Sequence, residues 1–429
     1  MTVDVRPPGD TPAPLPGSPA GARPRFAALG SRNFRLLWAG LIVSNAGSQM
    51  QTVAQGYLIY YVLTHSTFWL GLASLAFAVP MTLFPLLGGA LADRVDKLTL
   101  LKCTQTGQML SAGLITWITL SGQITVWWVL LTAFLGATFL AADNPARQAL
   151  LPELVPRQDL ISATALNGAS YTGAALIGPA LGGVLLPILT PGGLFLLNTL
   201  SFVAVFVALF LIRDVNSRPH GDSVPVGESL RQAGHYMQAT RVVGLLVLLS
   251  ALVGFFGRSY IQLTPAFARD LLHVDAQGLG LLYAAPGLGA LLGAGFLAGR
   301  RDMRVEQRIL IGAVLAFAGL LIAYSFNPWF PVALVLLTGT GVSSQVAATM
   351  ISTTLQLQTP GRLRGRILSF YAITIIGLAS LGALVTAILA EITGPGIAVA
   401  SGAVIMGGAA LLIAPHIHAM DALNADATR

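Results

Sequence analysis

Polar side chains recur on one face of three long apolar stretches, and they are the groups with which this chain could act on another molecule. Neighbours on a helix face lie three or four residues apart. Stretch 34–63 has this spacing at Asn45, Ser48, Gln49, Thr52 and Gln55, stretch 241–268 at Arg258 and Gln262, and stretch 329–357 at Thr338, Gln345, Thr349, Ser352 and Gln356. Such groups either join helices through hydrogen bonds or face a watery cavity. Because they recur on three stretches, we favour a shared cavity.

Arg258 is the costliest of these residues, because a charge at the centre of a membrane costs at least about 2.5–3.5 kcal/mol. Its side chain could contact a substrate or a coupling ion. Alternatively, it could reach the outer surface or pair with a backbone carbonyl. The sequence leaves both interpretations open.

Residues for other kinds of chemistry are missing from the apolar stretches. These stretches hold no carboxylate pair, no Ser/His/Asp set and no cluster of histidines, and the sequence has a single cysteine. We therefore expect no enzyme activity, no metal site and no cofactor.

The elements that position the polar residues must be membrane helices. The chain has 429 residues, of which 55% are hydrophobic and only 10% charged, with a mean hydropathy of +0.74. A soluble protein has about 25% charged residues. A helix that crosses a bilayer needs about 20 apolar residues. This rule predicts twelve spans, near 34–63, 68–91, 98–121, 125–144, 160–188, 193–212, 241–268, 277–299, 307–326, 329–357, 366–391 and 396–415.

The formal charge of +7 comes from Lys and Arg residues that lie between apolar runs, which argues for membrane topology and against nucleic-acid binding. Basic connections alternate with connections that lack Lys and Arg, except for Arg269 beside Asp270. The positive-inside rule then places both termini and the basic connections in the cytoplasm. We expect a disordered tail at 1–30, helix bundles at 31–212 and 241–415, a linker at 213–240 and a tail at 416–429.

The two bundles resemble copies of one six-helix unit. "GALADR" at 89–94 matches "GFLAGR" at 295–300, and "LLPELVPRQDLISA" at 150–163 matches "TLQLQTPGRLRGRI" at 354–367. Two matches at nearly the same offset predict an all-α membrane protein with twelve helices in two pseudo-symmetric bundles.

The loop "GALADRVDK" resembles the signature between the second and third spans of the major facilitator superfamily. Matching positions are Gly89, Leu91, Ala92, Asp93, Arg94 and Lys97, whereas Asp96 replaces a glycine. The resemblance implies that Gly89, Asp93, Arg94 and Lys97 form a cytoplasmic gate. In it, Asp93 would pair with the eleventh helix, near Arg362, Arg364 and Arg366. Asp93→Asn is then expected to lower export without lowering the amount of protein in the membrane.

A second motif lies in the fifth span, where "GAALIGPALGG" resembles the Gly-Pro-x-x-Gly-Gly motif of exporters of this superfamily. Gly178, Pro179, Gly182 and Gly183 match it. Small residues let helices approach closely, and a proline favours a bend. The motif would be a place where the two halves rock. An ordinary glycine-rich packing face is the alternative.

The first half is similar to the bacterial branch of siderophore and drug exporters, which implies export through proton antiport in the inner membrane. The only carboxylates near the interior are Asp143, at the cytoplasmic end of the fourth span, and Glu391, near the outer end of the eleventh. Asp143 is the proton-coupling candidate, although it could instead form a structural ion pair with Arg147, one turn on. Asn45, Gln49, Thr52, Gln55, Tyr171, Arg258, Gln262 and Gln345 are the expected substrate-binding residues.

Such a cavity suits a small amphipathic or anionic molecule. The expected partners are this substrate, protons and the lipid bilayer, without nucleic acid, and we expect a monomer. Two other functions stay open. The protein could be an importer or lysophospholipid flippase of the same fold, or a membrane sensor or scaffold that transports nothing.

Overall fold

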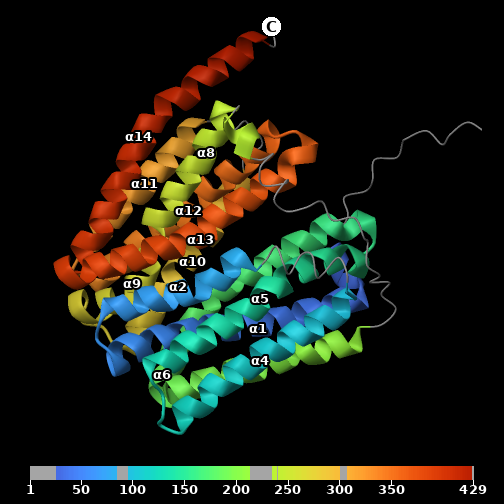
Figure 1. The fold of residues 1–429 in the computed structure, drawn as a ribbon, viewed down its shortest axis with the longest axis vertical. Helices are drawn as coiled ribbons and strands as arrows, with labels where there is room; N and C mark the ends of the chain where they lie inside the picture. Colours follow the sequence, from blue (N-terminus) through green and yellow to red (C-terminus); the bar gives the residue numbers. More distant parts are fainter. Residues whose placement is uncertain (1–25, 85–94, 213–233, 239, 300–306, 428–429) are drawn as a thin grey trace, which may run out of the picture.

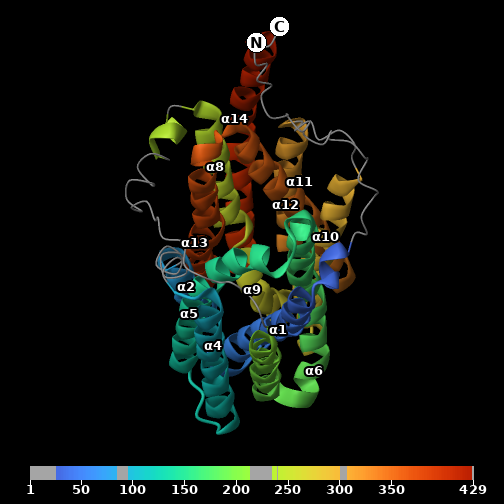
Figure 2. The same ribbon diagram turned by 90° about the vertical axis from the view of Figure 1, so that its right-hand side faces the viewer.

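The computed structural model describes residues 26–84, 95–212, 234–238, 240–299 and 307–427. These residues form helices joined by short connections (Figures 1 and 2). The first half contains α1 (Arg32–Tyr57), α2 (Thr67–Leu83), α4 (Lys97–Leu120), α5 (Val126–Leu154) and α6 (Leu160–Leu211). The second half contains α8 (Arg241–Leu252), α9 (Tyr260–Ala266), α10 (Ala276–Ala298), α11 (Gln307–Ser325), α12 (Phe330–Gln358), α13 (Gly361–Thr393) and α14 (Pro395–Ala427).

Shorter helical turns complete these elements. They are η1 (Ala27–Gly30), η2 (Leu58–Leu63), η3 (Arg157–Asp159), η4 (Val253–Gly257) and η5 (Phe267–Leu271), of which η2, η4 and η5 are π-helical. In the described part of the chain, eight helical segments are long and apolar enough to cross a membrane. The all-α membrane fold predicted from the sequence is therefore confirmed.

Helix α6 covers both the fifth and the sixth predicted spans. It consists of two helices that meet at Thr190, whose φ of 59° is not helical. Pro191 follows directly, and a proline disfavours the helical conformation of the residue before it. One sharp kink therefore replaces the loop that the sequence suggested between the two spans.

The seventh predicted span is interrupted. It consists of α8, η4, a break at Arg258–Ser259, and then α9 and η5. The backbone of α13 presses on η4 at this level. A Cβ atom on Gly254 would collide with the carbonyl of Thr374, and one on Gly382 with the carbonyl of Phe255. Kinks and π-helical turns of this kind are frequent at functional sites.

The internal repeat is visible in equivalent elements of the two halves. Helices α5 and α12 are each 29 residues long, and α12 begins and ends 204 positions after α5. Each is followed by a proline in the same extended conformation. Pro156 has φ −57° and ψ 144°, and Pro360 has φ −55° and ψ 143°. The sequence match at these positions therefore reflects a repeated helix–proline–helix unit.

The two halves meet along two seams. Helix α2 packs against α13, and α6 packs against α10, with α9 between the seams (Figure 2). The halves lie together near α9 and diverge away from it (Figure 1). We call the end that holds Tyr60, Ser66, Asp270 and Glu391 the closed end, and the opposite end the open end.

Tryptophans mark the level of the closed end. Five of the six tryptophans of the chain lie on helix ends beside its connections, at Trp69, Trp117, Trp127, Trp128 and Trp329. Trp69 and Trp127 pack edge to face, with ring centroids 5.3 Å apart. Tryptophan is enriched where a membrane meets water. The closed end therefore has the composition of a membrane interface.

Candidate functional site

A polar pocket of about 370 Å³ lies in the second half, between α12 and α13. It is lined by Gln345, Ala348, Thr349, Ser352, Thr353, Gln356 and Tyr371. Within it, the Gln345 amide donates to the Thr349 hydroxyl at 3.2 Å, and the Tyr371 hydroxyl donates to the Ala348 carbonyl at 3.0 Å. Four residues of the polar row that the sequence revealed on this span thus share one pocket.

Arg258 follows η4, which packs against α13, one of the two helices that form this pocket. It is exposed at the break between η4 and α9 and is not among the residues that line the pocket. Among the described residues, no carboxylate pairs with Arg258. Gln262, one turn further on, is half-buried. The pocket itself therefore offers neutral hydrogen-bonding groups, and the guanidinium group of Arg258, on a span packed against α13, has no counter-ion in this part of the chain.

The predicted residues of α1 have different surroundings. Thr52 is exposed, and its hydroxyl donates to the Ser48 carbonyl at 3.1 Å, whereas Asn45 and Gln55 are half-buried. Gln49 packs against Gly178 of α6. On the first half, Tyr171 is 66% exposed. These side chains do not line the pocket between α12 and α13, and their role in substrate binding stays a prediction.

Ser48 belongs to the same sequence row but points elsewhere. Its hydroxyl donates to Asn198 of α6 at 3.5 Å, and the amide of Asn198 donates to Gln51. This is a contact within the first half. Ser48 therefore follows the first interpretation given for such polar groups: its side chain joins two helices through a hydrogen bond.

The four residues of the Gly-Pro-x-x-Gly-Gly motif are buried and serve two different contacts. A Cβ atom on Gly178 would lie 2.5 Å from Gln49, and one on Gly182 would lie 3.3 Å from Met50, so both glycines face α1. Gly183 faces the other half instead. There, a Cβ atom on Gly280 of α10 would lie 2.7 Å from the carbonyl of Pro179. The motif thus packs α6 against α1 of its own half and against α10 of the other half.

Charged and aromatic groups join the halves at the closed end. The Tyr60 hydroxyl donates to Asp270, and Arg269 donates to His65 and, at 3.3 Å, to the Tyr60 carbonyl. The Arg269 guanidinium also lies 5.5 Å from the ring centre of Tyr61. Sequence reasoning missed this cluster. Its only signal was that Arg269 and Asp270 interrupt the pattern of uncharged connections.

Asp143 lies away from the polar pocket and is fully buried. It pairs with Arg147, and it accepts hydrogen bonds from Thr104 at 2.9 Å and from Gln105 at 2.8 Å. The ion pair considered as an alternative is therefore present. A role of Asp143 in proton coupling stays a prediction.

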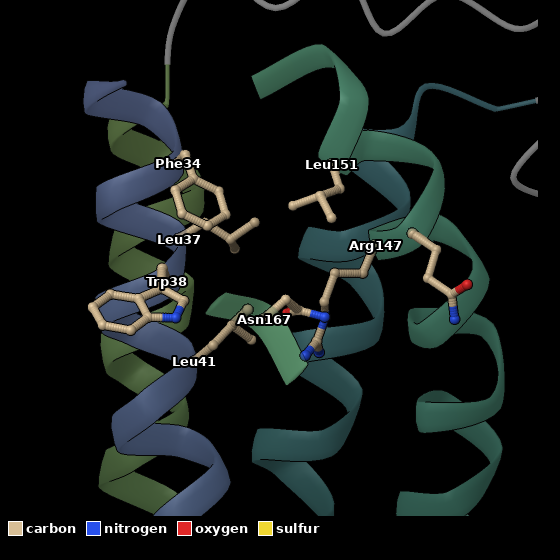
Figure 3. A pocket seen from close by; sticks show the side chains of 8 residues that line it. Phe34, Leu37, Trp38, Leu41, Arg147, Leu151 and Asn167 are labelled. Carbon is tan, nitrogen blue, oxygen red and sulfur yellow. The ribbon is translucent and has the colours of Figure 1, made fainter. Parts of the chain in front are cut away.

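Arg147 also reaches a second, small pocket between α1, α5 and α6. This pocket has a volume of about 10 Å³, enough for a single water molecule. Figure 3 shows Arg147 and Leu151 facing Trp38 and its neighbours on α1, with Asn167 between them. The Asp143–Arg147 pair is thus connected to the contact between α1 and the start of α6.

The predicted cytoplasmic gate is described only in part. Gly89, Asp93 and Arg94 lie outside the described residues, as does the side chain of Arg362. Lys97 pairs with Glu153, which fastens α4 to α5 within the first half. Asp96 caps α4 by accepting from the Thr99 backbone N–H at 2.8 Å.

Two packed groups of membrane helices, related by an internal repeat, with an open polar pocket in the second group, have the architecture of the major facilitator fold. The chain belongs to the family described as transmembrane secretion effector, whose model matches residues 23–429. It is a multi-pass membrane transporter of the major facilitator superfamily, and not an enzyme.

Two curated relatives extend over most of the chain. The enterobactin exporter EntS of Citrobacter koseri is 28% identical over 360 residues, which cover 79% of this chain and 83% of that protein. The staphyloferrin A transporter of Staphylococcus aureus is 24% identical over 361 residues, which cover 80% and 86% of the two chains.

Solved structures share the fold at low sequence identity. A POT family transporter in complex with 5-aminolevulinic acid has a TM-score of 0.71 at 13% identity and covers 92% of this chain and 98% of its own. A bacterial homolog of the human lysosomal transporter Spinster, inward-facing and unoccupied, has a TM-score of 0.67 at 15% identity, with 92% and 97% covered. Both likenesses concern the fold alone.

Proposed function

We propose that the protein exports a small amphipathic, anionic molecule of the siderophore or drug type by alternating access. The observation that carries this proposal is the polar pocket between α12 and α13, together with the unpaired charge of Arg258 on the neighbouring seventh span. Amides and hydroxyls fix the orientation of a ligand, and a guanidinium group suits a carboxylate or a catecholate. The names of the two curated relatives, an enterobactin exporter and a staphyloferrin A transporter, support a siderophore.

The open end is the cytoplasmic end in this proposal. Basic residues gather on the helix ends there, at Arg32, Arg35, Lys97, Lys102, Arg157, Arg241, Arg308, Arg364 and Arg366. Positively charged connections stay in the cytoplasm. The described conformation is then inward-open, in the inner membrane of a bacterium, with both termini in the cytoplasm.

The two bundles, 31–212 and 241–415, move against each other as units, and the linker 213–240 joins them. The bundles rock about two contacts, the seam between α6 and α10 and the seam between α2 and α13. Substrate sites of such transporters lie near the bilayer midplane, often beside broken helices. The break at Arg258 in the seventh span supports this location. We also propose that the protein acts as a monomer, because one chain contains both of the bundles that alternating access requires.

Proton exchange supplies the energy in this proposal, with Asp143 as the carboxylate. A proton on Asp143 would remove the negative charge that holds Arg147. Arg147 could then change its contacts in the small pocket between α1 and α6. The position of Asp143 thus links a protonation event to helix packing at the open end.

Accumulation assays test the function. Cells that lack their own siderophore exporters are loaded with labelled enterobactin or staphyloferrin A, with and without this protein. Export predicts lower retention in expressing cells and loss of this effect with a protonophore. Higher retention would instead indicate an importer. Equal retention for both compounds, and for a lysophospholipid, would favour the sensor or scaffold.

A further inference from the structure

Glu391 joins the two halves at the closed end through an unusual arrangement. It lies near the end of α13, in the second half, and its Oε2 atom lies at the beginning of α2, in the first half. Four donors converge on this one oxygen. They are the Thr67 hydroxyl at 2.7 Å, the Thr67 backbone N–H at 2.9 Å, the Ser66 hydroxyl at 3.1 Å and the Phe68 backbone N–H at 3.3 Å.

The first N–H groups of a helix have no partner within the helix, and the residue before it normally caps them with its own side chain. Ser66 occupies this position before α2, but its side chain makes no cap hydrogen bond. It donates to Glu391 instead. A carboxylate from the other half has therefore taken over the capping of α2, where the helix dipole favours a negative charge.

The helices around this cap are in close contact. A Cβ atom on Gly71, one turn into α2, would lie 2.6 Å from Ala387 and 3.0 Å from Leu384 of α13. The Thr67 hydroxyl also lies 2.9 Å from the Ala387 carbonyl. The closed end cannot open without moving α2 away from α13, and that movement must break all the bonds to Glu391.

We propose that Glu391 is the latch of the closed end, and that its release from α2 is a required step when this end opens during transport. Once Glu391 has left, the Ser66 hydroxyl can cap α2 in its place, because Ser66 is the residue directly before this helix. The helix start is thus capped in both states, by Glu391 when closed and by Ser66 when open. The inference rests on the alternating access proposed above.

Spin-label distances test the latch without a substrate. The exposed native Cys103 is first replaced by serine. One label pair, at Gln123 and Pro328, spans the closed end, and another, at Gln148 and Gln358, spans the open end. In Glu391→Gln, we expect the population with a long closed-end distance to rise about tenfold, with a matching decrease in the open-end distance. Glu391→Asp, which keeps the charge, should restore part of the closed population.

Thr393→Val is the matched control, because its hydroxyl bonds to the Leu389 carbonyl within α13 and not to α2. If Glu391→Gln does not fold, Thr67→Val removes one donor and should shift the distances less, in the same direction. Distances in Glu391→Gln, or in Thr67→Val as its substitute, that match those of the control would overturn the latch. A shift in a protein that transports no siderophore would refute the proposed function and keep the latch.

Discussion

Gly183 and Gly280 face each other across the two halves with no side chain between them. A Cβ atom on Gly183 would lie 2.7 Å from the Cα atom of Gly280, a separation that real Cβ atoms essentially never show. The obstacle is backbone, which cannot rotate away as a side chain can. This pair therefore sets how closely α6 and α10 can approach.

The first prediction concerns this approach. Leucine at position 183 overfills the seam, and overpacking costs about 1–3 kcal/mol. We expect Gly183→Leu to reduce transport by about tenfold, measured as siderophore efflux per amount of protein in the membrane. Gly173→Leu on the same helix is the control, because no atom lies within 4 Å of a Cβ placed there. Equal efflux in the two variants would contradict the prediction.

The second prediction concerns the charge of Arg258. Arg258→Gln removes the positive charge but keeps a hydrogen-bonding amide. A hydrogen bond to a charged group contributes about 1.5–3 kcal/mol. The KM for an anionic siderophore should therefore rise about ten- to a hundredfold, measured as uptake into inverted vesicles. Arg241→Gln, at the start of the same span, should leave the KM unchanged. An unchanged KM in Arg258→Gln would remove this residue from the binding site.

The third prediction concerns Asp143. Removing one partner of a buried ion pair destabilises a protein by about 3–5 kcal/mol, so the double variant Asp143→Asn/Arg147→Gln is used. If Asp143 carries the proton, this variant keeps transport down a substrate gradient and loses the stimulation by a pH gradient. Proteoliposome assays measure both.

Glu153→Gln is the control for Asp143, since Glu153 is a paired carboxylate on the same helix. It should keep the stimulation by a pH gradient. Full stimulation in the double variant would leave Asp143 with a structural role only.

The fourth prediction concerns the second contact at the closed end. Tyr60→Phe removes only the hydroxyl that donates to Asp270. Because Asp270 is exposed, the expected loss is about 0.5–1.5 kcal/mol. The long closed-end distance between labels at positions 123 and 328 should then gain about threefold in population. Tyr57→Phe, one turn earlier, serves as control, and a shift of the same size there would argue against a specific role of Tyr60.

Much of the fold could be predicted because apolar length and charge spacing are local properties of the sequence. The spans, the repeat and the polar row around Gln345 belong to this group. The break at Arg258 does not belong to it, and neither does the nearby contact of Gly254 with α13, because Gly254 and Thr374 lie more than a hundred positions apart in the sequence. Helical spacing also cannot say which neighbour a polar residue meets. Ser48 has the same spacing as Thr52 yet bonds to Asn198.

The contacts of the closed end lay beyond sequence reasoning for the same reason. Tyr60 and Asp270 are 210 positions apart, and Thr67 and Glu391 are 324 apart. Only the packing of α2 on α13 brings such residues together. Glu391 was visible as an acidic residue near the end of a span, but its partners were not.

The kink of α6 at Thr190 has a consequence for the surrounding lipid. The two arms are helices that meet at the single non-helical residue Thr190, so in the proposed alternating access a shift of the first arm, which carries the glycine motif, also displaces the start of the second. The second arm exposes apolar side chains such as Leu200, Val207 and Phe210. In the proposed rocking of the halves, these side chains would displace the acyl chains beside them, and the thickness and lateral tension of the bilayer would then affect the transport rate.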